Sequence, residues 1–157
     1  MNQSDIKPAG MISKDENISN ETGNPWGEFI KRAESECQAS PSAFEIVSVS
    51  IELDTSGSQN VNLLEEIMTG TATVYFASTR GSDEDALKVD VASKASISGS
   101  GIIRLENFAS QSELQVLSER LLGGDFHVGL RAETSRTRND AFSMDVRIIF
   151  EARAHCE

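Results

Sequence analysis

Apolar and polar residues alternate along several stretches of the chain, and this two-residue period is typical of β-strands. In residues 45–54, valine, isoleucine and leucine occupy alternate positions from 47 to 53. Similar patterns predict further strands at residues 71–79, 87–98, 102–106, 126–133 and 142–154. Because such alternation leaves one face polar, it indicates an antiparallel sheet with one buried and one wet face. A polar turn joins the last two segments, and we expect them to form a hairpin.

Two other stretches follow the period of an amphipathic helix. Asn24 and Pro25 are typical of a helix start, and apolar residues on one face continue from there to Cys37. A second helix is expected over residues 110–122, where Ser110 and Glu113 match the capping-box pattern and three leucines share one side. The predicted fold is therefore α+β: a mainly antiparallel sheet of five to six strands, one covering helix and a short N-terminal helix.

The first 23 residues show no period that would bury a face. They are rich in Asn, Ser, Asp, Glu and Lys, and their apolar residues, such as Ile6, Met11 and Ile18, are isolated. This composition is typical of a mobile polar segment. The predicted organisation is a disordered tail over residues 1–23, followed by a single α+β domain over residues 24–157.

Composition excludes some classes of function. The chain has 157 residues, 25 of them acidic and 14 basic, and its net charge of −11 disfavours binding to nucleic acid or to an anionic membrane. No signal peptide or membrane-spanning segment is recognisable, which predicts a cytoplasmic protein. Cys37 and Cys156 would meet if the N-terminal helix packs on the last strand, but a chain without an export signal favours reduced thiols.

Residue types that carry catalysis or bind metals are few and scattered. His155 and Cys156 are neighbours in a predicted strand and point to opposite faces, which disfavours a shared metal ion. None of the serines lies in the G-x-S-x-G motif of a nucleophile elbow. We therefore expect no catalytic residue, no cofactor and no metal site, and hence a protein that is not an enzyme.

Several polar residues near the end of the chain are candidate contacts for an anion or an acidic partner. They lie on the polar faces of the last two predicted strands and are His127, Arg131, Arg147 and Arg153. The alternative is that these arginines pair across strands with Glu133, Asp145 and Glu151. Trp26, the only tryptophan, and Phe29 share the apolar face of the N-terminal helix and are candidate anchors, either in the core or in a partner.

One region resembles a known family. Residues 53–59 (LDTSGSQ), residues 84–87 (EDAL) and residues 95–102 (ASISGSGI) are similar, in sequence and in order, to the bacterial SecB export chaperones. The resemblance covers about residues 47–102. It implies an acidic, cytoplasmic, tetrameric protein that binds unfolded polypeptides. The family continues into two C-terminal helices, whereas this chain is predicted to have one helix followed by two strands, and it lacks the tyrosine- and arginine-containing start of the family's long helix.

Open sheet edges and faces rich in Ser and Thr favour contact with other chains. We therefore expect a non-enzymatic protein-interaction module that forms a homo-oligomer and binds another polypeptide, with a SecB-like chaperone as its most specific version. One alternative is a phage or particle assembly subunit. Another is a small-molecule-binding domain or enzyme with a pocket between the sheet and the helix of residues 110–122.

Overall fold

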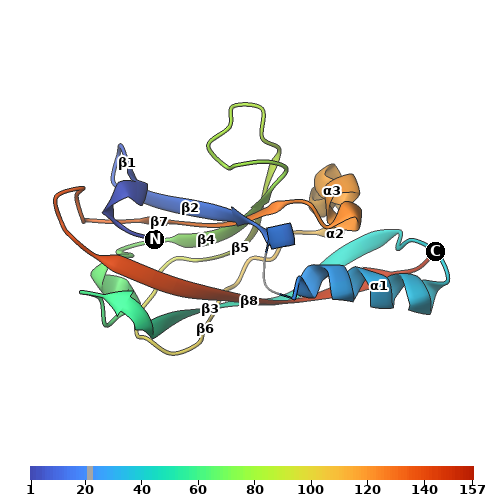
Figure 1. The fold of residues 1–157 in the computed structure, drawn as a ribbon, viewed down its shortest axis with the longest axis horizontal. Helices are drawn as coiled ribbons and strands as arrows, with labels where there is room; N and C mark the ends of the chain where they lie inside the picture. Colours follow the sequence, from blue (N-terminus) through green and yellow to red (C-terminus); the bar gives the residue numbers. More distant parts are fainter. Residues whose placement is uncertain (21–22) are drawn as a thin grey trace.

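Two antiparallel sheets lie face to face in the computed structural model, which describes residues 1–20 and 23–157 (Figure 1). The five-stranded sheet has the order β1-β2-β7-β4-β5, and the three-stranded sheet has the order β6-β3-β8. The strands are β1 (Ile6–Lys7), β2 (Met11–Asn17), β3 (Ala43–Gln59), β4 (Ala72–Ala77), β5 (Lys88–Lys94), β6 (Ile103–Arg104), β7 (His127–Glu133) and β8 (Ser143–His155). The α+β class and the antiparallel pairing are confirmed, but the described residues hold eight strands in two sheets.

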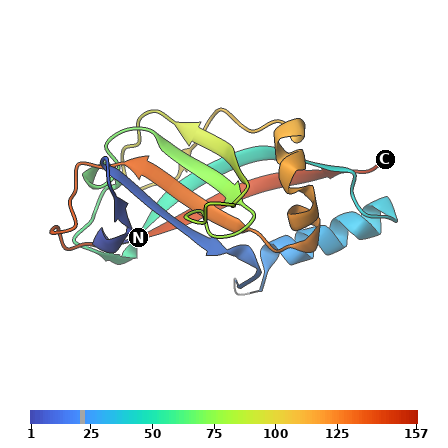
Figure 2. The same cartoon turned by 90° about the horizontal axis from the view of Figure 1, so that it is seen from above.

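The helices gather at one end of the sheets (Figure 2). They are α1 (Pro25–Cys37), α2 (Gln111–Leu114) and α3 (Ser118–Gly123), and the single 3₁₀ turns are η1 (Gln3–Asp5), η2 (Ile18–Asn20), η3 (Leu64–Glu66) and η4 (Gln115–Leu117). The helix expected over residues 110–122 is present as α2, η4 and α3 in succession. Ser110 and Glu113 form the expected capping box, and Gly124 ends α3 with a φ of +66°, which favours glycine.

The core lies between the two sheets because each sheet turns an apolar face inward. Ile51 of β3 and Phe76 of β4 are fully buried there. At the helical end, the buried side chains of α2, η4 and α3 cover the core. They are Leu114, Leu117 and Leu121. The face that these leucines share in the sequence is thus the face that the structure buries.

The expected hairpin of the last two strands is wrong. β7 lies in the five-stranded sheet between β2 and β4, whereas β8 pairs with β3 in the other sheet. The connection between them crosses from one layer to the other. Two arginines fix it: Arg136 Nε donates to the carbonyl of Glu66 at 2.9 Å, and Arg138 Nε donates to the carbonyl of Ile6 at 3.0 Å. Alternation shows which face a strand buries, but it does not identify the neighbouring strand.

The expected disordered tail is also wrong for the residues that the structure describes. β2 pairs with β7 over its whole length, from Met11 opposite Glu133 to Asn17 opposite His127. The isolated isoleucines are the reason, because Ile6, Ile12 and Ile18 are at most 5% exposed and hold this segment on the core. Residues 21 and 22 of the predicted tail lie outside the described part.

The two sheets are joined along one side and separate along the other. On the joined side, Ser93 of β5 and Glu106 exchange backbone hydrogen bonds of 2.9 and 2.8 Å, and Leu105 donates to the carbonyl of Val49 in β3 at 2.8 Å. On the other side lie β8, at the edge of its sheet, and β2, which is flanked only by the two-residue edge strand β1. Within the described residues, β1 covers only the start of the β2 edge, opposite Met11 and Ile12.

A disulfide joins Cys37, at the end of α1, to Cys156, just after β8, with their Cα atoms 5.3 Å apart. The expectation of reduced, unpaired thiols is therefore wrong. That expectation was based on the cytoplasmic compartment predicted from the sequence. In the structure, α1 packs beside the end of β8 and brings the two cysteines together (Figure 1). Of the helices in the described ranges, none has the length and apolar character that crossing a membrane requires.

Candidate functional site

A groove of about 900 Å³ lies between β2, α1 and β8, on the side where the sheets are separate. Its apolar floor consists of side chains that pack on the core but stay half-buried, chiefly Val128 of β7 and Val146, Ile148 and Phe150 of β8. The two candidate anchors also line it: Trp26 is 3% exposed and Phe29 is half-buried. We call this feature the β2–β8 groove.

The backbone of β8 turns unpaired groups toward this groove. Met144, at the start of β8, exchanges two hydrogen bonds with Met1, from Met144 N to Met1 O at 2.7 Å and from Met1 N to Met144 O at 2.8 Å. Asp145 N points the other way, toward β3, and donates to Ser58 Oγ at 3.0 Å. Because these directions alternate along a strand, Val146 and Ile148 present their N–H and C=O groups to the same side as Met144.

Beyond Met144, the edge of β8 has no strand partner in the part of the chain that the structure describes. The edge-facing residues are Val146, Ile148, Phe150 and Ala152. Their side chains belong to the apolar inner face, and all four are half-buried. The groove therefore combines unpaired backbone donors and acceptors with an apolar surface, the two features that an added β-strand requires.

The β2 wall of the groove is different in character. Lys14 and Glu16 face inward, on the same side of the sheet as Leu130 and Val128, which are their partners in β7. The two charged groups lie 3.6 Å apart and form a solvent-exposed ion pair. Charged side chains that point inward on an edge strand discourage the pairing of further strands. Of the two edges, β8 is thus the one open to strand addition.

The candidate arginines divide between the sheets. Arg147 and Arg153 lie on β8 beside the groove, and both make ion pairs with β3. Arg147 contacts Glu52 at 3.1 Å, and Arg153 contacts Glu45 at 3.9 Å. These pairs are cross-strand, as the alternative interpretation held, but the acidic partners are not the ones expected from the sequence.

Arg131 and His127 lie apart from these two, on the outer face of the five-stranded sheet. Arg131 contacts Asp90 of β5 at 2.7 Å, and its guanidinium lies 5.6 Å from the centre of the Tyr75 ring. His127 Nδ1 lies 2.6 Å from Asp15 Oδ1. The structure therefore does not bring the four candidate residues together into one anion site.

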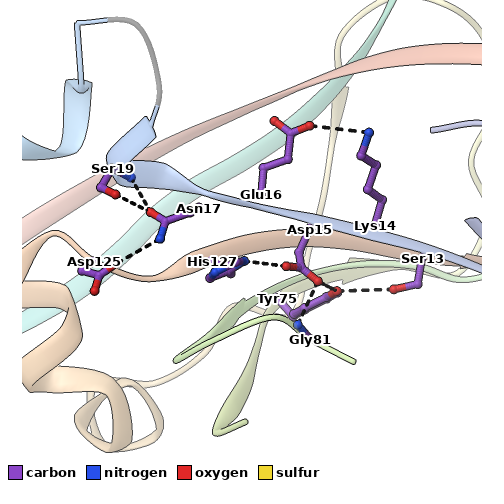
Figure 3. Close-up of polar contacts among 10 residues, drawn as sticks. All are labelled: Ser13, Lys14, Asp15, Glu16, Asn17, Ser19, Tyr75, Gly81, Asp125 and His127. Atoms are coloured by element: carbon purple, nitrogen blue, oxygen red, sulfur yellow. Dashed lines mark hydrogen bonds and ion pairs between the residues drawn. The ribbon is translucent and has the colours of Figure 1, made fainter. Parts of the chain in front are cut away.

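Asp15 is the centre of a polar cluster on this outer face (Figure 3). Its second carboxylate oxygen accepts a hydrogen bond from Tyr75 at 3.2 Å and one from the backbone N–H of Gly81 at 2.9 Å. The Tyr75 hydroxyl is also 3.3 Å from Ser13 Oγ. Among the residues that the structure describes, Ser13 is the serine that bonds to this cluster, and it contacts Tyr75 and not His127. The cluster therefore lacks the order of a nucleophile–base–carboxylate triad. Its bonds tie β2, β4, β7 and the β4–β5 loop together.

Tyr75 is buried although it lies on the outer face. Its ring covers Gly129 of β7, where any Cβ would overlap the ring, and the β4–β5 loop packs on it through Gly81. This burial raises the pKa of the Tyr75 hydroxyl, and the nearby negative charge of Asp15 raises the pKa further.

We expect Tyr75 to ionise above the ordinary tyrosine pKa of about 10. The raised pKa contributes stability that is fully present below the pKa of the unfolded state and is lost as pH rises through the pKa of the folded state. Tyr75 is the only tyrosine, so the ultraviolet absorbance of tyrosinate measures it directly. The same titration in denaturant is the control, and a native midpoint at or below the denatured one would contradict the prediction.

Sequence reasoning missed Asp15 and the groove for one reason. Asp15 lies in the segment interpreted as a tail, and β2, which forms one wall of the groove, lies there too. The six-residue spacing of Ile6, Ile12 and Ile18 is the signal that could have revealed a buried segment.

No protein-family model matches the chain, and comparison with curated proteins and with solved structures finds no significant similarity.

Proposed function

We propose that this protein is a non-enzymatic interaction module that binds an extended stretch of another polypeptide in the β2–β8 groove. The polypeptide adds a strand to the edge of β8. The observation that carries the proposal is the groove itself, whose floor is apolar and half-buried and whose β8 wall offers unpaired backbone groups. Main-chain hydrogen bonds supply affinity in this mode, and contacts of alternate side chains supply specificity.

A chaperone that holds unfolded clients is the more specific version of this proposal. Unfolded chains offer extended, apolar segments, and the groove supplies the complementary surface. The resemblance of residues 47–102 to the SecB export chaperones supports the same version.

An apolar small molecule is a second candidate, favoured by the volume of the groove. About 900 Å³ falls within the range typical of ligand pockets. The groove is not where the sequence placed a pocket, since α1 and β2 border it and the helix of residues 110–122 does not. A small ligand would contact the floor without ordering the β8 backbone, so amide exchange separates the two candidates.

Amide hydrogen exchange resolved by NMR tests the proposal. The probe is a permanently unfolded protein, reduced and carboxymethylated α-lactalbumin. Addition of the probe is expected to slow exchange at the edge-facing amides by about tenfold or more, while amides that point toward β3 change little. The edge-facing amides are Val146, Ile148, Phe150 and Ala152. Absence of this alternating protection when the probe binds would contradict strand addition.

Matched variants locate the binding surface. Ile148→Glu places a charge on the floor of the groove and is expected to weaken binding of the probe about tenfold or more. The control is Val116→Glu, because Val116 is 56% exposed on η4 and is not among the residues that line the groove. Equal binding by both variants would place the client elsewhere on the molecule.

A further inference from the structure

The outer face of β8 carries charges of alternating sign around a central apolar residue. Its exposed side chains, in chain order, are Asp145, Arg147, Ile149, Glu151 and Arg153. Ile149, at the centre of this row, is 39% exposed. This row of side chains borders the edge at which we propose that a client strand binds.

The two arginines of this row already have anionic partners in β3. Arg147 lies 3.1 Å from Glu52 and 3.8 Å from Asp54, and Arg153 lies 3.9 Å from Glu45. Their charges are therefore paired within the sheet, and they do not require acidic residues on a partner strand.

The two carboxylates of the row, unlike the arginines, have no partner of opposite charge in β3. Asp145 stands opposite Asp54 in β3, and Glu151 stands opposite Ser48. Neither Asp145 nor Glu151 makes a salt bridge with any residue in the described ranges 1–20 and 23–157. β3 supplies no cation to either carboxylate, so a basic residue on a strand added at the free edge is the cross-strand partner that both can accept.

We infer that the client strand runs antiparallel to β8 and carries two basic residues six positions apart, opposite Glu151 and Asp145. This inference rests on the proposed function and adds the chemistry of the partner. Side chains directly opposite each other in an antiparallel pair lie close enough to form ion pairs. The short pairing already present at this edge, Asn2 with Ser143, is antiparallel as well.

The space beside β8 limits which kind of polypeptide can supply such a strand. Figures 1 and 2 both show α1 running alongside the C-terminal half of β8, and Trp26 and Phe29 of α1 line the groove with Phe150. A strand added at the usual spacing of about 4.8 Å from β8 would enter the groove, whereas a second strand beyond it would be directed at α1. The client is therefore an extended segment that is not part of a sheet of its own.

The same limit decides against a second copy of this chain. In an antiparallel β8–β8 pair centred on Ile149, Asp145 would face Arg153 and Arg147 would face Glu151, so the charges would match. In a folded copy, however, β8 is paired with β3, and that neighbouring strand would occupy the position of α1. We therefore assign the edge to a client segment, and the test below includes the second copy as an outcome.

Three synthetic peptides of nine residues test the inference, because Met1 and Asn2 already occupy the edge opposite Met144 and Ser143. Valine occupies the even positions, which face the floor, and threonine occupies the odd positions that are not charged. The first peptide carries lysine at the third and ninth positions, the second carries glutamate there, and the third carries lysine at the third and seventh positions. The first is expected to bind about tenfold more tightly than either of the others, as measured by fluorescence anisotropy.

Charge reversal on the protein supplies the matched control. The double variant D145K/E151K changes two exposed side chains and is expected to invert the preference, so that the glutamate peptide binds about tenfold more tightly than the first lysine peptide. Circular dichroism checks that the variant is folded. A double variant that keeps the preference of the original protein would overturn the inference.

The remaining outcomes separate the inference from the proposed function. Equal binding of all three peptides, with alternating amide protection in β8, would overturn the inference and leave the proposed function standing. Failure of both the peptides and unfolded α-lactalbumin to bind would overturn both. A dimer in sedimentation equilibrium that dissociates on D145K/E151K, with no peptide preference, would assign the edge to a second copy and overturn the inference.

Discussion

Replacing Trp26 with alanine is expected to lower the free energy of unfolding by about 3–5 kcal/mol. The side chain is 3% exposed, and its indole Nε1 donates to the carbonyl of Leu121 at 2.8 Å. Four rings surround it at centroid distances of 4.8–5.9 Å, namely Phe29, Phe44, Phe126 and Phe150. The substitution removes these contacts, leaves a cavity and removes the shorter of two hydrogen bonds to the Leu121 carbonyl, which then keeps only the one from Gly124 N at 3.3 Å. A loss of this size is a large fraction of the stability of an ordinary domain.

Urea unfolding followed by circular dichroism measures the effect. Trp26→Phe keeps an aromatic ring but removes the indole N–H, so it is expected to cost less than the alanine variant. Phe29→Ala is the control within the same helix, because Phe29 is only half-buried. A loss below about 1 kcal/mol for Trp26→Ala would contradict the core role. It would restore the alternative that this tryptophan is an anchor for a partner.

Removal of the disulfide has the second large expected effect. Cys37 and Cys156 are 119 positions apart, so the bond closes most of the chain into one loop. In the chain-entropy account, a loop of about this length stabilises the folded state by roughly 4–5 kcal/mol, mainly through the unfolded chain. The double variant C37S/C156S is expected to lose up to that amount in urea unfolding.

Reduction provides the control for this prediction. Dithiothreitol should destabilise the original protein by as much as the double substitution does, and it should leave C37S/C156S unchanged. Two free thiols in the folded, non-reduced protein would contradict the pairing. Disulfides persist in oxidising compartments and are rare in the cytosol, so the bond weighs against the cytoplasmic location expected from the sequence.

The strands of the second half of the chain could be predicted because their inward residues alternate over long stretches. β8 was expected over residues 142–154 and extends over Ser143–His155. β4 shows the limit of that reasoning. All six of its residues are buried, and the outward-facing Tyr75 lies beneath Gly81 of the β4–β5 loop. A loop that covers a sheet leaves no periodic signal in the strand beneath it.

The site was harder to predict than the fold. Arg131 and Arg147 were correctly placed on polar strand faces, but those faces belong to different sheets. The predicted hairpin would have placed the two residues side by side. In the structure, β7 and β8 belong to different sheets, so the residues lie apart. The disulfide and the β2 wall depend on contacts between distant segments, and local pattern carries no information about those.

The joined and separate sides of the two sheets have a consequence for how the proposed client would enter the groove. The backbone hydrogen bonds between Ser93 and Glu106 hold the sheets together on one side, and β2 and β8 lie apart on the other. Because the groove is open along the side between β2 and β8, an extended segment would be able to enter it from that side without passing its end through an opening. Binding as we propose it would therefore not require a free chain end, and an internal stretch of a long unfolded polypeptide would be able to enter the groove.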